Sequence, residues 1–324
     1  MTFESTSRAS RFGMVVPESQ TAVLPLALLA ALAIGGCGGS GSSEDGELSP
    51  VDSGPTNVNV ADPVLRIADN APVRPGSALS LVWSDEFDGV RLDPRTWFFE
   101  VGDGSQYGIP GWGNNELQWY LADSAITSGG LLILTARRQQ QGAHDYTSAR
   151  INTRDRFAFR YGRIEARIRL PGGQGIWPAF WLMPQEDTYG TWAASGEIDI
   201  VEARNLGRSG IDTVLGTLHY GGMSPNNVFS GNEYVVAGSA TADFHEYALE
   251  WDPNEIRWYV DGVLYAVQNY WFTESADYPA PFDQPFYVIL NVAVGGRFPG
   301  APDSTTVFPL SMEVDYVRVY SGAD

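Results

Sequence analysis

Apolar and polar residues alternate along most hydrophobic segments of this chain, a pattern typical of β-strands that bury one face. The clearest run is residues 163–170, where isoleucine, alanine and leucine alternate with charged side chains. Similar runs occur at residues 130–136, 246–251, 286–294 and 312–320. No helical stripe of comparable length competes with them. We therefore expect an all-β fold, an antiparallel β-sandwich.

A hairpin is expected within residues 256–265, where an Asp-Gly pair separates two apolar runs. This pair favours the tight turn that joins two antiparallel strands. Among the ten tryptophans, those in ordinary strand patterns are expected to pack in the core. They are Trp83, Trp97, Trp251 and Trp258.

Three carboxylates lie close together in the segment Glu-Ile-Asp-Ile-Val-Glu at residues 197–202. In a regular strand Glu197 and Asp199 share a face, whereas Glu202, five positions after Glu197, points to the other face. A β-bulge at residues 200–201 would return Glu202 to the first face, and bulges are frequent next to active sites. The spacing therefore predicts a bulged strand with all three carboxylates on one side.

Carboxylates that share a face repel each other, which raises the pKa of at least one of them. Cleavage of a glycosidic bond uses such a split, with one ionised nucleophile and one protonated acid. A separation of about 5–5.5 Å between the two carboxyl groups predicts retention through a covalent intermediate, and about 6.5–9.5 Å predicts inversion. We favour retention. The alternative is that these alternating charges are only the solvated face of a strand.

Five segments, in this order, carry a resemblance to a known family. They are Gly-Trp-Gly-Asn-Asn-Glu-Leu-Gln (111–118), Tyr-Gly-Arg-Ile-Glu-Ala-Arg (161–167), Trp-Pro-Ala-Phe-Trp (177–181), Gly-Glu-Ile-Asp-Ile-Val-Glu (196–202) and His-Tyr (219–220). Over about residues 78–322 the chain resembles glycoside hydrolase family 16, in particular its laminarinase branch of endo-β-1,3-glucanases. The resemblance implies a jelly-roll, concanavalin A-like sandwich with a concave substrate cleft. It also implies Glu197 as nucleophile, Glu202 as acid/base and Asp199 as the carboxylate that assists the nucleophile.

The resemblance further implies residues that contact the substrate. Aromatic side chains suit the apolar faces of sugar rings, and polar groups in a glycine-rich loop can reach hydroxyl groups. The residues are Trp112, Asn114, Asn115, Glu116, Arg163, Trp177, Trp181, Trp192 and His219. For each, a structural role is the alternative: core packing for tryptophan, turn formation for asparagine, a solvated strand face for arginine and a satisfied partner for histidine.

Members of this family often bind a structural calcium ion on the face away from the cleft. By resemblance its ligands here are Glu86, Gly130 and Asp315, and oxygen ligands suit this hard cation. Acidic residues on such a surface are expected in any case. Catalysis is expected to need no cofactor, and three dispersed histidines with a single cysteine make no zinc site.

The N-terminal region reads as an export signal. Residues 21–34 form an apolar run with the length of a signal-peptide core, too short to span a bilayer comfortably. The only cysteine, Cys37, follows it in a context that resembles the bacterial lipoprotein signal, in which the thiol is lipidated. We expect a signal peptide over 1–37, a flexible Gly/Ser/Pro/Asp-rich tether over 38–77 and a catalytic domain over 78–324. The protein would be exported and either lipid-anchored at the bacterial cell envelope or secreted.

The charge balance limits the partners. All 20 basic residues are arginines, against 39 acidic residues, which gives a formal net charge of −19. This charge disfavours nucleic acid and anionic polymers, and it is compatible with a neutral β-glucan. We expect a monomeric retaining endo-hydrolase of β-1,3-glucan (laminarin). The alternatives are a hydrolase of mixed-linkage β-glucan, agarose or carrageenan, a transglycosylase, and a non-catalytic glucan-binding protein.

Overall fold

The computed structural model describes residues 64–74 and 76–323. The predicted signal peptide, Cys37 and most of the predicted tether lie outside these residues. Within this part of the chain, no helix has the length and apolar character needed to cross a membrane.

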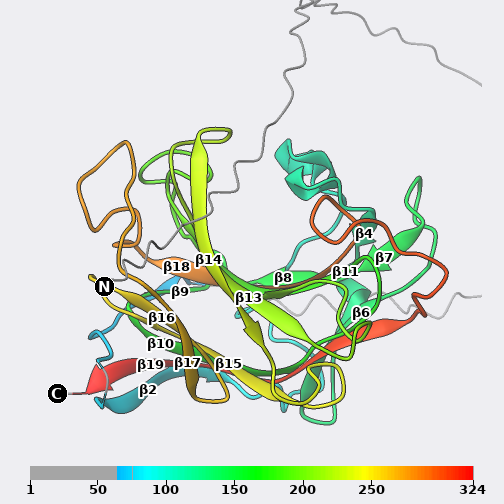
Figure 1. Ribbon diagram of the computed structural model, residues 1–324, viewed down its shortest axis with the longest axis horizontal. Coiled ribbons are helices and arrows are strands. Elements are labelled where there is room, and N and C mark those ends of the chain that lie inside the picture. The colour runs from blue at the N-terminus through cyan, green and yellow to red at the C-terminus, as the bar shows by residue number, and fades with distance from the viewer. Residues whose placement is uncertain (1–63, 75, 324) are drawn as a thin grey trace, which may run out of the picture. The chain divides into compact units, whose positions relative to one another are not determined.

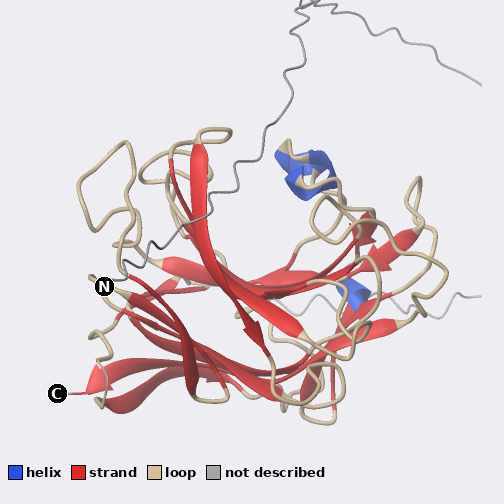
Figure 2. Cartoon of the chain, in the orientation of Figure 1, coloured by secondary structure: helices blue, strands red, loops and turns tan. Residues whose placement is uncertain are grey.

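Two large β-sheets pack face to face (Figures 1 and 2). The nine-stranded sheet has the order β1 (Arg66–Asp69), β9 (Phe157–Arg160), β18 (Phe286–Val294), β11 (Ile176–Pro184), β12 (Glu197–Ala203), β13 (Thr213–Gly221) and β14 (Asn227–Val235), with β3 (Phe98–Phe99) and β8 (Arg150–Asn152) beside this path. The eight-stranded sheet has the order β17 (Val263–Gln268), β16 (Ile256–Val260), β15 (His245–Trp251), β10 (Gly162–Arg169), β19 (Leu310–Ala323), β6 (Leu131–Ala136) and β5 (Ala125–Ser128), with β2 (Ala78–Asp85) paired to β19.

Smaller elements lie in the connections. Strands β4 (Gln118–Tyr120) and β7 (Tyr146–Ser148) form a two-stranded parallel sheet. Three short 3₁₀ turns are η1 (Ser105–Tyr107), η2 (Pro110–Gly113) and η3 (Ala122–Ser124).

The predicted antiparallel sandwich is confirmed. In the two large sheets every strand pair is antiparallel except β1 with β9. The hairpin of β16 and β17 turns at Asp261 and Gly262, whose φ angles of 49° and 75° are both positive. Positive φ at both turn residues is what a type I′ hairpin turn requires.

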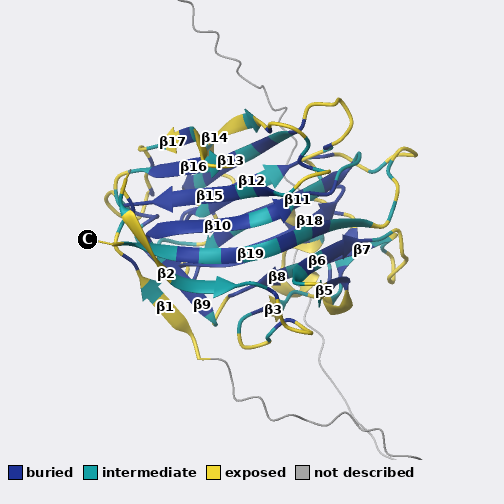
Figure 3. Ribbon diagram, turned by 90° about the horizontal axis from the view of Figure 1, so that it is seen from below, coloured by how far each residue is buried: buried dark blue, intermediate teal, exposed yellow. Residues whose placement is uncertain are grey.

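The hydrophobic core lies between the two sheets. Ile164, Ala166 and Ile168 of β10 are buried in it, and so are Ile198 and Ile200 of β12. Figure 3 views the eight-stranded sheet from outside and shows β10, β15 and β16 buried along most of their length, whereas β19 alternates between buried and partly exposed positions. Because side chains alternate along a strand, residues next to these core positions lie on the outer faces of the sandwich. Charged residues of β10 and of β12 therefore lie on opposite outer faces.

The predicted tether ends earlier than residue 77. Residues 64–74, which we call the N-terminal strap, begin with β1, whose partner is the edge strand β9. After β1, the Ala71 carbonyl accepts from Gly322 N at 2.9 Å, and the Val73 carbonyl accepts from the guanidinium of Arg257. Backbone hydrogen bonds to a free strand edge order this segment. A four-residue strand is too short to show periodicity in the sequence.

Candidate active site

Strand β12 contains the predicted β-bulge. Asp199 and Glu202 are three residues apart on β12, whereas their register partners on β13 are two residues apart. The register between β12 and β11 shifts at the same place. Ile200 and Val201 are both buried in the core, at 2% and 1% exposure. The extra residue therefore keeps Glu202 on the same outer face as Asp199.

We call this outer face of the nine-stranded sheet, around Glu197, Asp199 and Glu202, the carboxylate face. Two indole groups bind its glutamates. Trp192 Nε1 donates to Glu197 Oε2 at 2.8 Å, and Trp177 Nε1 donates to Glu202 Oε1 at 3.0 Å. Each glutamate thus has one carboxyl oxygen fixed by a tryptophan.

His219 of β13 lies beside two of the carboxylates. Its Nε2 is 3.3 Å from Asp199 Oδ2 and 3.6 Å from Glu197 Oε1. Burial opposes the charged imidazolium, but Glu197 and Asp199 raise the pKa of His219 to about 10. His219 is therefore a cation at neutral pH, held between two carboxylates. Within the described part of the chain, Glu197, Asp199 and His219 form the one group whose ligand atoms lie close enough together to hold a metal ion.

The two glutamates differ in acidity. Burial, then the neighbouring Asp199 charge, raises the pKa of Glu197 to about 7. Burial together with the charges of Asp199 and Glu197 raises the pKa of Glu202 well above its usual range. Glu197 is closer to the His219 cation and so loses its proton first. The arrangement supplies one ionised carboxylate beside one protonated carboxylic acid, the pairing needed at a sugar acetal.

Trp181 and Trp112 both contact Arg150, a buried arginine that the sequence motifs did not single out. The guanidinium carbon of Arg150 is 4.9 Å from the Trp181 ring centroid and 4.4 Å from that of Trp112. Arg150 also forms an ion pair with Glu100, and both side chains are 12% exposed. Trp181 Nε1 donates to Asn291 Oδ1 at 2.7 Å. Arg150 begins the three-residue strand β8, in which no periodic signal singles it out.

The loop residues predicted to contact the substrate mainly build the loop itself. Glu116 is 7% exposed and accepts hydrogen bonds from Asn114 Nδ2, Gln118 Nε2 and the Tyr120 hydroxyl. Burial raises the pKa of Glu116, and the Arg150 cation opposes this shift. Trp112 is 5% exposed and donates to the Gly102 carbonyl at 3.3 Å, while Asn115 has a φ of 58°, typical of a turn.

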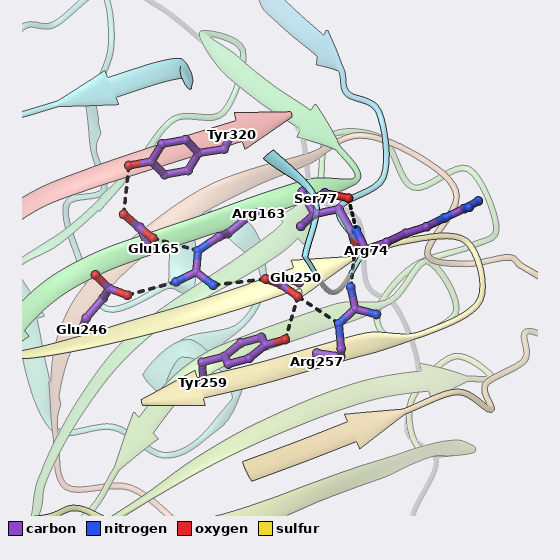
Figure 4. A network of polar contacts seen from close by, with 10 residues as sticks. Arg74, Ser77, Arg163, Glu165, Glu246, Glu250, Arg257, Tyr259 and Tyr320 are labelled. Carbon is purple, nitrogen blue, oxygen red and sulfur yellow. Dashed lines mark hydrogen bonds and ion pairs between the residues drawn. The ribbon is translucent and has the colours of Figure 1, made fainter. Parts of the chain in front are cut away.

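The assignment of Arg163 to substrate contact is wrong. Arg163 lies on β10 of the eight-stranded sheet, on the outer face opposite to the carboxylate face. Three carboxylates surround its guanidinium, at 2.8 Å (Glu165), 3.0 Å (Glu246) and 3.3 Å (Glu250) (Figure 4). A strand pattern tells which residues share a face but not which sheet the strand joins. The solvated-strand alternative is wrong as well, because the Arg163 side chain is only 11% exposed and its cation is paired with carboxylates instead of water.

The three predicted calcium ligands belong to neighbouring segments of the eight-stranded sheet. Strand β19, which contains Asp315, pairs with β2 just before Glu86 and with β6 just after Gly130. Both carboxylates already have cationic partners: Arg318 binds Glu86 at 2.8 Å and 3.0 Å, and Arg167 binds Asp315 at 2.7 Å. Any calcium ion here would compete with these arginines for the side chains. The calcium site stays a prediction.

Comparison with known proteins bears on this geometry. The family model for glycosyl hydrolases family 16 matches residues 113–318, which include the bulged strand and all three carboxylates. The chain belongs to glycosyl hydrolase family 16. Its resemblance to that family, seen first in the sequence motifs, is confirmed.

Two relatives and one solved structure of this family are similar over most of the chain. The β-glucanase of Rhodothermus marinus is 44% identical over 253 residues, 74% of this chain and 84% of the relative. Glucan endo-1,3-β-glucosidase A1 of Niallia circulans is 42% identical over 78% of this chain, but the match spans only 40% of that longer protein. The laminarinase catalytic domain of Thermotoga petrophila RKU-1 is 41% identical, with a TM-score of 0.69, over 76% of this chain and all of that domain. The similarity to this solved laminarinase domain confirms the predicted jelly-roll sandwich.

Proposed function

We propose that this family 16 chain is a retaining, endo-acting hydrolase of β-1,3-glucan. One observation carries the proposal. A β-bulge places Glu197 and Glu202 on one face, and their surroundings raise the pKa of Glu202 further than that of Glu197. The names of the relatives, which refer to β-glucan and endo-1,3-β-glucan hydrolysis, support the substrate class.

The reaction follows from the roles that the two glutamates can take. Ionised Glu197 attacks the anomeric carbon, and protonated Glu202 gives its proton to the departing glycosidic oxygen. This step leaves a glycosyl ester on Glu197. Glu202, now a carboxylate, removes a proton from water as the water attacks the same carbon and releases Glu197. His219 and Trp192 hold the Glu197 carboxylate in place throughout.

Neutral glucan is the substrate that the charge balance favours. A net charge of −19 repels sulfated chains such as carrageenan, whereas indole rings near the glutamates suit uncharged sugar rings. The non-catalytic alternative, a glucan-binding protein, does not require two glutamates with different pKa values. The geometry therefore favours catalysis over binding alone.

The test is to size the products released from laminarin, lichenan, agarose and carrageenan, and to follow the anomers by NMR. Laminarin should be cut internally to short oligosaccharides, with the β-anomer appearing first and then mutarotating. A rate on agarose or carrageenan at least about tenfold above that on laminarin would overturn the substrate. First appearance of the α-anomer would overturn retention.

We further propose that Cys37 carries lipid and anchors the enzyme at the bacterial cell envelope. The apolar run before the cysteine and the Gly/Ser-rich sequence after it support this proposal. Metabolic labelling with a fatty-acid analogue should mark the wild type but not Cys37→Ser, and that variant should be released from membranes. A soluble, unlabelled wild type would mean ordinary secretion instead.

A further inference from the structure

Strand β14 is the edge of the nine-stranded sheet, two strands away from β12. In Figure 1 it rises at that edge, away from the other sheet. Phe229, Gly231 and Glu233 alternate along it and share one face. Phe229 is the register partner of His219, and Gly231 is the register partner of Thr217, which in turn pairs with Asp199. The carboxylate face therefore continues onto β14.

The Phe229 ring is the outermost of three neighbouring aromatic rings that begin at the nucleophile. Trp192, which binds Glu197, has its ring 5.8 Å from that of His219, and the His219 ring is 5.9 Å from that of Phe229. Phe229 is 72% exposed. A single exposed apolar residue is ordinary, but an exposed ring that continues a line of rings from a sugar-cleaving centre offers a platform for the apolar face of another sugar.

Gly231 keeps the surface beside this platform flat. A Cβ at this position would lie 2.8 Å from both the Gly216 carbonyl oxygen and Thr217 Oγ1, so a larger residue has no room without displacing the backbone. Beyond the glycine, Glu233 is exposed. Glu233 follows Phe229 by four positions along the strand, which places their Cα atoms roughly 13 Å apart. A ring, a flat floor and a carboxylate acceptor thus follow one another on the same face.

We propose that Phe229, Gly231 and Glu233 form a distal subsite for a neutral hexopyranose unit of the polysaccharide chain. The sugar stacks on Phe229, its ring passes over Gly231, and its hydroxyl groups donate to Glu233. Two strand spacings separate β14 from β12, about 10 Å, so this unit lies away from the bond that is cut. Glu233 repels sugars with anionic substituents. The inference rests on the proposed glucanase function and adds a residue set that selects chain length and charge.

The experiment compares kcat/KM for the wild type, Phe229→Ala, Phe229→Trp and Val228→Ala on β-1,3-linked oligosaccharides of increasing length. Val228 is the matched control, because it is an exposed apolar residue of the same strand on the opposite face. For long chains Phe229→Ala should lose about five- to tenfold, mainly in KM, and the loss should fade for the shortest substrates. Phe229→Trp should restore the activity, and Val228→Ala should match the wild type at every length.

The charge selection has its own comparison, between neutral and carboxymethylated β-1,3-glucan. Glu233→Gln should raise the rate on the carboxymethylated polymer relative to the neutral one by about threefold. Asp243→Asn, an exposed acid in the loop before β15, should leave that ratio unchanged. An unchanged ratio in Glu233→Gln would overturn the role of Glu233.

These experiments test the proposed subsite and the proposed function independently. If the wild type cuts β-1,3-glucan but Phe229→Ala keeps full activity on long chains, the subsite is wrong and the proposed function stands. An equal loss at every chain length would also overturn the subsite, because it would mean that Phe229 only supports His219. If the wild type prefers another polysaccharide, the proposed function fails, and the same length series on that substrate decides about Phe229.

Discussion

Trp258 donates a hydrogen bond from its indole nitrogen, at 2.8 Å, to the backbone carbonyl of Asp199. Trp258 is fully buried on β16 of one sheet, whereas Asp199 lies at the bulge of β12 in the other. A bulge interrupts the regular pairing of a strand, and Trp258 gives the Asp199 carbonyl a partner there. Gly216 makes the approach feasible, since a Cβ there would lie 2.4 Å from the Trp258 ring. The core thus holds the catalytic strand in its bulged form.

Replacing Trp258 with Phe removes this hydrogen bond and should lower both the stability of the protein and its kcat. The Asp199 carbonyl would be left buried without this partner, at a cost of about 1–3 kcal/mol in the free energy of unfolding. Looser placement of Glu202 should lower kcat by about tenfold or more. Chemical denaturation and steady-state kinetics measure both effects. Trp251→Phe, which removes an equally buried indole that donates to Phe282 instead, is the control and should affect stability more than kcat.

The roles of the two glutamates can be separated by substitution. Glu197→Gln should remain folded and lose about 10⁴-fold or more in turnover, because the proposed nucleophile is gone. Glu202→Ala should regain activity with azide on a substrate with a good leaving group, since that substrate needs no acid and azide can enter the vacated space. A β-configured azide product, detected by NMR, would identify Glu202 as the acid/base. Failure of azide to rescue would count against that role.

The pH profile should depend on His219. The proposed reaction needs Glu197 ionised and Glu202 protonated. The rate should therefore rise as pH passes the Glu197 pKa of about 7 and fall at higher pH, as Glu202 ionises. His219→Gln removes the cation that lowers the pKa of Glu197, and the acid limb of kcat/KM should move to higher pH. His245→Gln, a buried histidine paired with Asp261, should leave the limb in place. An unmoved limb in His219→Gln would mean that this cation does not tune the nucleophile.

Stability should respond to Glu202 in a pH-dependent way. The pKa of Glu202 is higher in the folded than in the unfolded chain, so folding stability falls as pH rises from the usual carboxyl range through the folded pKa. Glu202→Gln keeps the oxygen that accepts from Trp177 but never ionises. Its Tm should exceed that of the wild type at pH 7.5, and the difference should shrink towards pH 4. Equal Tm differences at both pH values would contradict this linkage.

Arg150 and Arg163 provide a matched pair, because their side chains are 12% and 11% exposed and both contact carboxylates. Replacing either with Met leaves a buried carboxylate, Glu100 or Glu165, without its arginine and should cost about 3–5 kcal/mol in stability. Only Arg150→Met should also lower kcat/KM below the unfolding temperature, since Arg150 contacts the rings of Trp112 and Trp181. Similar kinetic losses in both variants would show that the effect reports stability alone.

The features that could be predicted from the sequence lie within single strands and turns. The parity of the Glu197 to Glu202 spacing was sufficient to predict the bulge, and the Asp-Gly pair was sufficient for the hairpin at Asp261. Alternation along residues 163–170 gave the correct faces but could not tell which sheet the strand joins. The substrate contact of Arg163 was inferred from the family motif, and the alternation offered no check on it.

Contacts between distant segments were not predictable in this way. Arg150 reaches Trp112 and Trp181 only after folding, and its three-residue strand has no detectable period. Trp258 was correctly expected in the core, but nothing in its strand pattern indicates a bond to the Asp199 carbonyl. Each of these contacts joins different strands of the sandwich, whereas a periodic pattern describes one strand at a time.

The N-terminal strap has a practical consequence for recombinant production. A gene shortened to begin at residue 78, where the family-like region starts, would encode a protein without β1 and without the backbone partners of Gly322 and Arg257. Strand β9, with the buried rings of Phe157 and Phe159, would become the bare edge of its sheet. Such an edge is open to pairing with another copy, so the shortened protein should precipitate during expression, whereas one that begins at or before residue 64 should stay in solution.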